Sequence, residues 1–329
     1  MKKSHIFRTG ALLILIVSIF MDISCKEVKK EDSQNMESAQ MKAETMEPFF
    51  ELSLAQWSIH NMIRNDSVDP YTFAEKAKGW GFTGLEYVSQ LYPPDLENNE
   101  YSAEAMNAFV EKSNAEAKKH GMRNVLIMID RQGNLAVSDA AERKAAVERH
   151  FKWVDAAAKM GCHSIRVNLA GSEEPEEWMA NSIDGLSQLA TYAKDKNINV
   201  IVENHGGLSS NGAMLAEVMT KVNMDNCGTL PDFGNFCIVR SETGCAEAYD
   251  KYMGVKELME HAKAVSAKSH DFDEDGNETE IDYARMLQIV KDAGYSSFIG
   301  VEYEGNVLSE EEGIIATRDL LLNAAKKVK

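Results

Sequence analysis

The chain has 329 residues, of which 44% are apolar, and its 52 Asp and Glu against 35 Lys and Arg give a formal charge of −17. This length and apolar content are sufficient for one large core or for two smaller domains. An acidic surface repels phosphate backbones, and no local basic stripe is present in the sequence, so the composition argues against a nucleic-acid partner.

The N-terminus has the pattern of an export signal. Three basic residues precede an apolar stretch at 11–20 that is too short for a comfortable membrane span. A small residue before Cys25 is typical of a bacterial lipoprotein cleavage site, although Asp22 occupies a usually apolar position. We expect residues 1–25 to be a signal peptide with a lipidated cysteine; ordinary secretion and an uncleaved anchor are the alternatives. Residues 26–48 are polar without periodicity, which predicts a flexible tether. The protein is thus expected at the cell envelope, touching the membrane only through a lipid anchor.

From about residue 50 the chain repeats an amphipathic helix, a short turn and a β-rich run. Gly121 precedes MRNVLIMID and Gly161 precedes CHSIRVNLAG. A glycine at this place accepts the left-handed conformation that closes the last helical turn. Strands are predicted in this way at residues 52–58, 83–88, 123–129, 163–169, 198–203, 227–232, 263–270 and 297–302.

Eight strand-plus-helix units over about 280 residues predict a (β/α)8 TIM barrel for residues 49–329. An open doubly wound sheet is the alternative. Its usual signal is missing, because no GxGxxG follows the first strand and no Walker-type GK[ST] is present. A disulfide between Cys237 and Cys245 is an open alternative in an oxidising compartment.

Four apolar runs in the second half each end in a side chain that binds hard or borderline metal ions. These residues lie 29, 38 and 32 positions apart, about one strand-plus-helix unit each, so their strand ends can meet at one end of a barrel. Two Glu, one Asp and one His suit one divalent ion, Mn²⁺, Mg²⁺, Co²⁺ or Zn²⁺, with positions left for a substrate. A chance scatter of acids is the alternative. The candidate metal ligands are Glu203, Asp232, His270 and Glu302.

The same segments resemble the xylose-isomerase-like barrels, a group that includes sugar epimerases, inosose dehydratases and endonuclease IV nucleases. The resemblance spans about residues 50–325 and depends on VENHGG, LPDFGN, AKSHDFD followed by IDYARML, and DAGYSSFIGVEYEG. Carried over by position, it implies the same four metal ligands. It also implies that Glu203 and Glu302 act as the catalytic acid/base pair on opposite faces of the substrate.

Two positions depart from that pattern. Many relatives have a seventh-strand histidine two residues before the lysine, where this chain has Ser266. His270 follows four residues later on the same expected strand face and is expected to substitute for it. Many epimerases also have a histidine where this chain has Asn235, which weakens the transfer of any particular substrate preference.

Further polar residues at the expected barrel mouth are candidates for substrate binding. Alternate strand residues share a face, so Arg166, His205 and Lys268 are expected to point toward the metal ligands. Glu86 is a candidate for sugar hydroxyls, with a structural ion pair as the alternative. Trp57 is a candidate for stacking on a sugar face, with a core position as the alternative.

The reaction implied by these residues is proton transfer next to a carbonyl, with a metal ion stabilising the enediolate charge. We therefore predict a metal-dependent sugar isomerase or epimerase. One alternative is a lyase that acts on 3-keto-glycosides by metal-assisted elimination, and another is a non-catalytic sugar-binding lipoprotein. A nuclease is disfavoured, because that branch, as the resemblance implies, uses three zinc ions and more histidines than this chain offers.

Overall fold

The computed structural model describes residues 47–329, and Pro48–Lys329 form one compact unit. The predicted signal peptide, Cys25 and nearly all of the tether lie outside the described residues. Lipidation of Cys25 therefore stays a prediction, which metabolic labelling with palmitate would test. Among the described residues, no helix is long and apolar enough to cross a membrane.

All eight predicted strands are present, and they form one sheet of parallel neighbours in the order β6-β5-β4-β3-β2-β1-β10-β9. Isolated parallel bridges join the two outer strands, at Thr229 with Ala262 and at Asp232 with Ser266. The predicted barrel is thereby closed on its eighth side. The strands are β1 (Glu51–Ala55), β2 (Gly84–Val88), β3 (Arg123–Met128), β4 (Ser164–Val167), β5 (Asn199–Glu203), β6 (Cys227–Leu230), β9 (Val265–Ser269) and β10 (Phe298–Tyr303).

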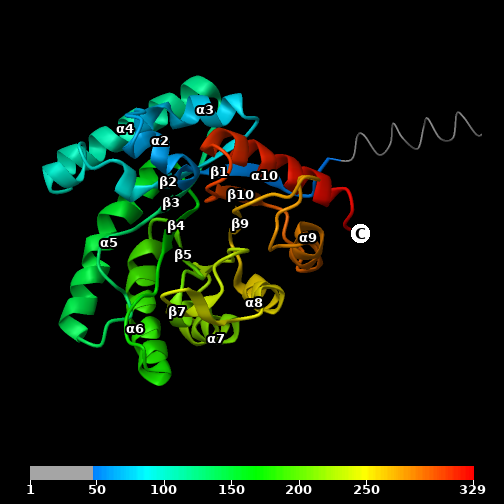
Figure 1. Ribbon diagram of the computed structural model, residues 1–329. Coiled ribbons are helices and arrows are strands. Elements are labelled where there is room, and N and C mark those ends of the chain that lie inside the picture. The colour runs from blue at the N-terminus through cyan, green and yellow to red at the C-terminus, as the bar shows by residue number, and fades with distance from the viewer. Residues whose placement is uncertain (1–46) are drawn as a thin grey trace, which may run out of the picture. The chain divides into compact units, whose positions relative to one another are not determined.

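Helices lie around the outside of the strands (Figure 1). One longer helix follows each barrel strand along the chain, and a short helix, α2 (His60–Arg64), adds to the segment after β1. The longer helices are α3 (Phe73–Gly79), α4 (Ala103–His120), α5 (Ala140–Met160), α6 (Pro175–Lys194), α7 (Gly212–Val222), α8 (Lys251–Leu258), α9 (Tyr283–Asp292) and α10 (Glu310–Ala325).

Capping residues explain where these helices begin and end. The Asp139 side chain accepts a hydrogen bond from the third backbone N–H of α5, which otherwise has no partner in the helix. Gly121 and Gly161 follow α4 and α5 with φ of 65° and 73°, as predicted. After each of these glycines a short connection leads into the next strand, so the end of the helix determines where that strand begins.

The apolar face of α9 shows how the helices attach to the sheet. Four of its side chains recur at helical spacing and are at most 2% exposed. Full burial of one such side chain stabilises the fold by about 1.5–3 kcal/mol. This stripe holds α9 against the barrel, where the Tyr283 hydroxyl donates to the backbone carbonyls of Ala267 and Lys268 in β9. Its residues are Tyr283, Met286, Leu287 and Val290.

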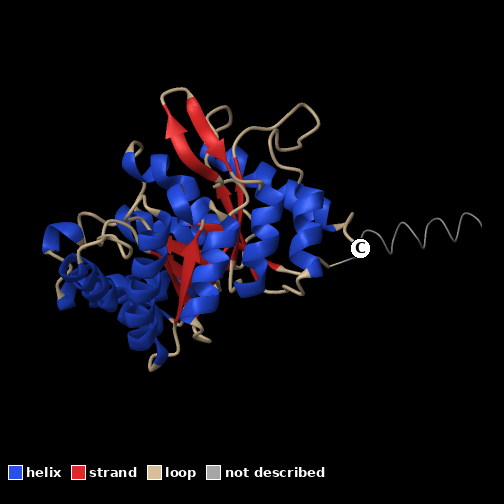
Figure 2. Ribbon diagram, turned by 90° about the horizontal axis from the view of Figure 1, so that it is seen from below, coloured by secondary structure: helices blue, strands red, loops and turns tan. Residues whose placement is uncertain are grey.

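An antiparallel hairpin between β6 and α8 was not predicted. It consists of β7 (Cys237–Ser241) and β8 (Gly244–Ala248), and Figure 2 shows it projecting from the body of the barrel. Its side chains are mostly exposed on both faces, so the sequence lacks the alternation that predicts a strand. The disulfide between Cys237 and Cys245 that the sequence left open is present and joins the two strands.

Candidate metal centre at the carboxyl end of the barrel

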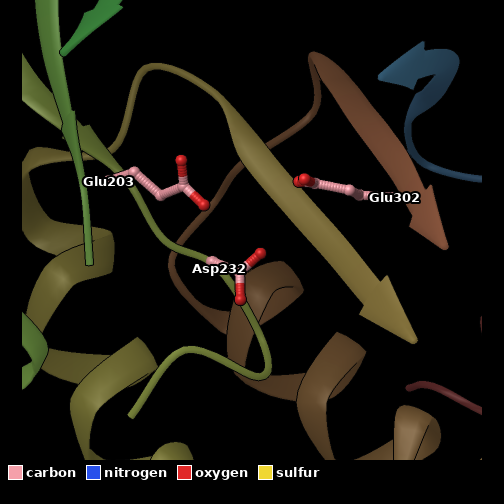
Figure 3. A group of neighbouring side chains, drawn as sticks. All are labelled: Glu203, Asp232 and Glu302. Atoms are coloured by element: carbon pink, nitrogen blue, oxygen red, sulfur yellow. The ribbon is translucent and has the colours of Figure 1, made fainter. Parts of the chain in front are cut away.

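Three buried carboxylates meet at the carboxyl end of the strands. Glu203 is the last residue of β5, Asp232 lies two residues beyond β6, and Glu302 is the fifth residue of β10. One oxygen from each lies within 4.8 Å of the others, and all three side chains are at most 3% exposed. In Figure 3 the three carboxylates point toward a shared space. We call these three residues the carboxylate triad.

Backbone and amide groups hold Asp232 in a fixed orientation. Its Oδ1 accepts hydrogen bonds of 2.8 Å from the backbone N–H groups of Gly234 and Asn235. The side chain of Asn204 accepts from the Asp232 backbone N–H and donates to the Asp232 carbonyl. With Oδ1 satisfied by backbone, Oδ2 is the oxygen that faces the other two acids.

Glu203 is held from two sides. Asn235 Nδ2 donates to its Oε1 at 3.0 Å. Arg166 Nε lies 2.9 Å from its Oε2 but out of alignment for a hydrogen bond, so both buried atoms have no hydrogen-bond partner among the described residues. The Arg166 guanidinium is fixed instead by Asp130, 3.0 Å from its Nη1. A buried carboxylate oxygen without a hydrogen bond, in a residue grouped with two further carboxylates, is an arrangement that a cation would complete.

Lys268 supplies a second buried cation. Its Nζ lies 2.9 Å from Glu304, 3.5 Å from Glu302 and 3.8 Å from Asp232. Burial opposes its charge, but the carboxylates of Asp232 and Glu302 outweigh burial and raise the pKa of Lys268 well above its usual value. Lys268 is therefore a counter-ion of the triad, and it is only 1% exposed.

Burial also shifts the pKa of two acids of the triad, Glu302 and Asp232. It raises the pKa of Glu302 well above the usual range, and Lys268 acts in the opposite direction. Burial likewise raises the pKa of Asp232, again opposed by Lys268. The positive charges of Arg166 and Lys268 thus do not fully balance the negative charges of the surrounding carboxylates. A divalent ion would supply the missing positive charge. The donor set therefore fits the predicted metal ion, which the three triad residues would hold.

His270 is not part of this group, contrary to the expectation that it completes the metal ligands. Strand β9 ends at Ser269, so the alternation of side chains that placed His270 on the inner face no longer applies. Its half-buried side chain lies beyond the strand, and its backbone N–H faces Glu278 Oε1 at 3.4 Å. The hydroxyl of Ser266, deeper in β9, contacts the triad instead, with Oγ at 2.7 Å from Asp232 Oδ2 and 3.1 Å from Glu302 Oε2.

The predicted substrate-binding residues have different surroundings. Arg166 and Lys268 are buried and paired with acids, so their first role is to compensate charge. His205 lies two residues beyond β5 and is exposed at the rim, where a substrate can reach it. Trp57 lies in the turn after β1, half-buried, with its ring stacked on His60 at 4.4 Å and the Arg64 guanidinium 4.7 Å from the ring centroid.

Glu86 lies inside the barrel, which differs from the predicted place at the end of β2. It is the third residue of that strand and is 1% exposed. Ser53 Oγ donates to its Oε1 at 2.6 Å, and Oε2 has no hydrogen-bond partner among the described residues. A Cβ on Gly300 would lie 2.4 Å from Oε1, so the glycine makes room for the acid. Burial raises the pKa of Glu86 to about 7.

We expect Glu86→Gln to stabilise the protein at alkaline pH. Because the folded pKa exceeds the ordinary value of 4.5, the native state binds the extra proton, and wild-type stability falls as the pH rises from 4.5 through about 7. The variant should lack this decline and be up to about 3 kcal/mol more stable at pH 8. Urea unfolding at several pH values measures this, with the exposed Glu111→Gln as control. Equal pH dependence in wild type and Glu86→Gln would contradict the prediction.

Several residues of the site were not assigned a role from the sequence. Asn204 directly follows β5, and Asp130 lies two residues beyond β3. Their position at the end of a barrel strand is the sequence signal that could have identified them. Asp130 fixes Arg166, Asn168 donates to the same Asp130 oxygen at 3.0 Å, and Asn204 fixes the loop of Asp232. Their roles depend on contacts between strands, which spacing alone does not reveal.

The fold agrees with the comparison to known families. The model of the xylose isomerase-like TIM barrel matches residues 74–324. The chain therefore belongs to that family, as the resemblance in its motifs implied. A search of curated proteins finds no match for the sequence.

Solved structures share the fold at low sequence identity. IolI protein with a bound zinc atom has a TM-score of 0.64 and 15% identity, covering 85% of this chain and 99% of its own. The 3-keto-D-glucoside 4-epimerase YcjR from E. coli has a TM-score of 0.61 and 13% identity, covering 84% and 100%. A xylose isomerase-like protein from Mycobacterium smegmatis in complex with magnesium has a TM-score of 0.59 and 15% identity, covering 86% and 98%.

Proposed function

We propose that the protein is a metal-dependent sugar isomerase or epimerase. The observation that carries this proposal is the carboxylate triad, three buried acids with oxygens within 4.8 Å of one another at the carboxyl end of a barrel. Active sites of (β/α)8 enzymes lie at this end. Membership of the xylose isomerase-like family and the likeness to a 3-keto-D-glucoside 4-epimerase support the reaction class.

Glu203 and Glu302 are the proposed acid/base pair. They come from β5 and β10, which are not neighbours in the sheet, so their carboxylates reach the shared space from different sides. One takes a proton from the carbon next to a substrate carbonyl, and the other returns a proton from the opposite side. A bound divalent ion supplies stabilisation of the negative charge that develops on the substrate oxygens. Arg166 and Lys268 hold the two glutamates in place.

Exchange of substrate protons with solvent tests the proposal. The protein is incubated in D₂O with a panel of ketoses and 3-keto-glycosides, with and without added Mn²⁺, and carbon-bound deuterium is measured by NMR. We expect deuterium at the carbon next to the carbonyl in at least one sugar, dependent on the ion. Binding of a sugar without any exchange across the panel would favour the sugar-binding alternative and refute the isomerase.

A second candidate is the lyase that acts on 3-keto-glycosides. A cavity of about 630 Å³ lies between the segments that follow β1 and β2 and is lined by Arg64, Tyr71, Gln90 and Tyr92 among others. Gln90 Nε2 donates to Asp130 Oδ2 at 3.2 Å, and Asp130 holds Arg166, so this cavity adjoins the residues around the triad. None of the triad residues lines this cavity, and we propose it as the space for a leaving group attached to the sugar. Release of a free aglycone in the same panel would identify elimination, whereas exchange without release identifies the isomerase.

A further inference from the structure

Ser266 occupies the place from which a side chain of β9 reaches the triad. It is 1% exposed, and its hydroxyl lies within hydrogen-bond distance of both Asp232 Oδ2 and Glu302 Oε2. A hydroxyl has one proton to donate, so it satisfies one of these two oxygens at a time. A parallel bridge joins Ser266 to Asp232 through the backbone, which fixes its position relative to the acids.

Apart from the cationic nitrogens of Arg166 and Lys268, which cannot bind a metal ion while protonated, the side-chain atoms described at the triad are oxygens. The group within 4.8 Å consists of three carboxylates, and the nearest side chain of β9 adds a hydroxyl. Neither predicted imidazole belongs to this group: His270 follows the end of β9, and His205 is exposed at the rim. Glu203 is 1% exposed, and its Oε2 has the charge of Arg166 beside it but no hydrogen-bond partner among the described residues, which leaves it free to bind a cation.

We infer that the carboxylate triad takes a hard divalent cation, Mg²⁺ or Mn²⁺, in a site whose protein ligands are all oxygen, and that Ser266 sets this preference. Carboxylate and water ligands suit Mg²⁺ and Mn²⁺, whereas imidazole raises affinity for Zn²⁺ and Co²⁺. An imidazole at position 266 would point between Asp232 and Glu302 and supply that nitrogen. The inference depends on the proposed function only in that both require a divalent ion.

Metal affinities of two variants test the inference. Full-length protein is stripped with a chelator and titrated calorimetrically with Mg²⁺, Mn²⁺, Co²⁺ and Zn²⁺, in wild type, Ser266→His and His270→Ala. We expect Ser266→His to raise the affinity for Zn²⁺ relative to Mn²⁺ by about tenfold or more. His270→Ala should leave this ratio within about twofold of wild type.

Pulsed electron paramagnetic resonance of the Mn²⁺-loaded protein gives a direct readout that does not depend on a variant. Coupling to ¹⁴N from a coordinating imidazole should be absent in wild type and should appear in Ser266→His. If Ser266→His does not fold, as judged by circular dichroism, the presence or absence of ¹⁴N coupling in the wild-type spectrum still tests whether all protein ligands are oxygen.

Three results would overturn the inference. They are ¹⁴N coupling in wild type, a loss of metal affinity in His270→Ala, and a folded Ser266→His with an unchanged ratio of Zn²⁺ to Mn²⁺ affinity. Failure of the proposed function is distinguishable from failure of this inference. A protein that binds Mn²⁺ through oxygen alone but catalyses no deuterium exchange would refute the isomerase and would still support the oxygen site.

Discussion

Glu302→Gln is expected to abolish the exchange of substrate protons with solvent. The amide has the size of the carboxyl and can still accept the hydrogen bond of Ser266, but it cannot take up or return a proton. Loss of one acid/base group lowers the rate by about 10²- to 10⁴-fold. The measurement is carbon-bound deuterium by NMR in the sugar that the wild type exchanges, at saturating Mn²⁺.

The control for this variant is Glu311→Gln, which changes an exposed glutamate on α10. It should exchange at the wild-type rate. Because Glu302 is also a proposed metal ligand, Mn²⁺ affinity is measured beside the rate, and the variant is compared at full metal occupancy. Full exchange in Glu302→Gln would rule out proton transfer by this residue.

Lys268→Met is expected to make the fold depend on a divalent ion. Lys268 Nζ is the nearby cation for Asp232, Glu302 and Glu304, and its removal leaves the buried Asp232 and Glu302 without that charge. Leaving a buried charge unpaired costs about 3–5 kcal/mol. An ion that binds only the native state adds stability in proportion to the logarithm of its concentration over its Kd, so Mn²⁺ should restore part of the loss.

Thermal unfolding with chelator and with Mn²⁺ measures this effect. We expect a fall in Tm of the stripped variant well beyond that of Lys327→Met, which removes an exposed lysine near the C-terminus. We also expect a larger rise in Tm on adding Mn²⁺ in Lys268→Met than in wild type. An equal rise in both proteins would show that Lys268 and the ion do not compensate the same carboxylates.

Local patterns were sufficient to predict the eight barrel strands, because each is a short apolar run and all but the first follow a helix along the chain. The helix ends at Gly121 and Gly161 were found for the same reason, since the left-handed residue there is a property of the local backbone. The hairpin of β7 and β8 escaped prediction. Its exposed strands pair with each other and bury no apolar face that the sequence would reveal.

Convergence of Glu203, Asp232 and Glu302 was predictable from sequence, because carboxyl ends of adjacent parallel strands meet at one end of a barrel. The contact of Ser266, in place of His270, with these acids was not predicted from the sequence. Which residue of β9 faces the acids depends on where the strand ends and on its register with β10, where Lys268 lies opposite Glu302. A difference of a few residues decides whether an imidazole or a hydroxyl contacts the acids.

Periodicity and short-range geometry were therefore enough to predict the order of the eight barrel strands and the chemical types at their ends. Only the tertiary structure decided which of those side chains share a buried space, that Arg166 and Lys268 compensate the acids, and that Glu86 lies inside the barrel. These features depend on contacts between residues about 30 or more positions apart. Their energies come from burial and charge pairing, which exist only after the barrel has closed.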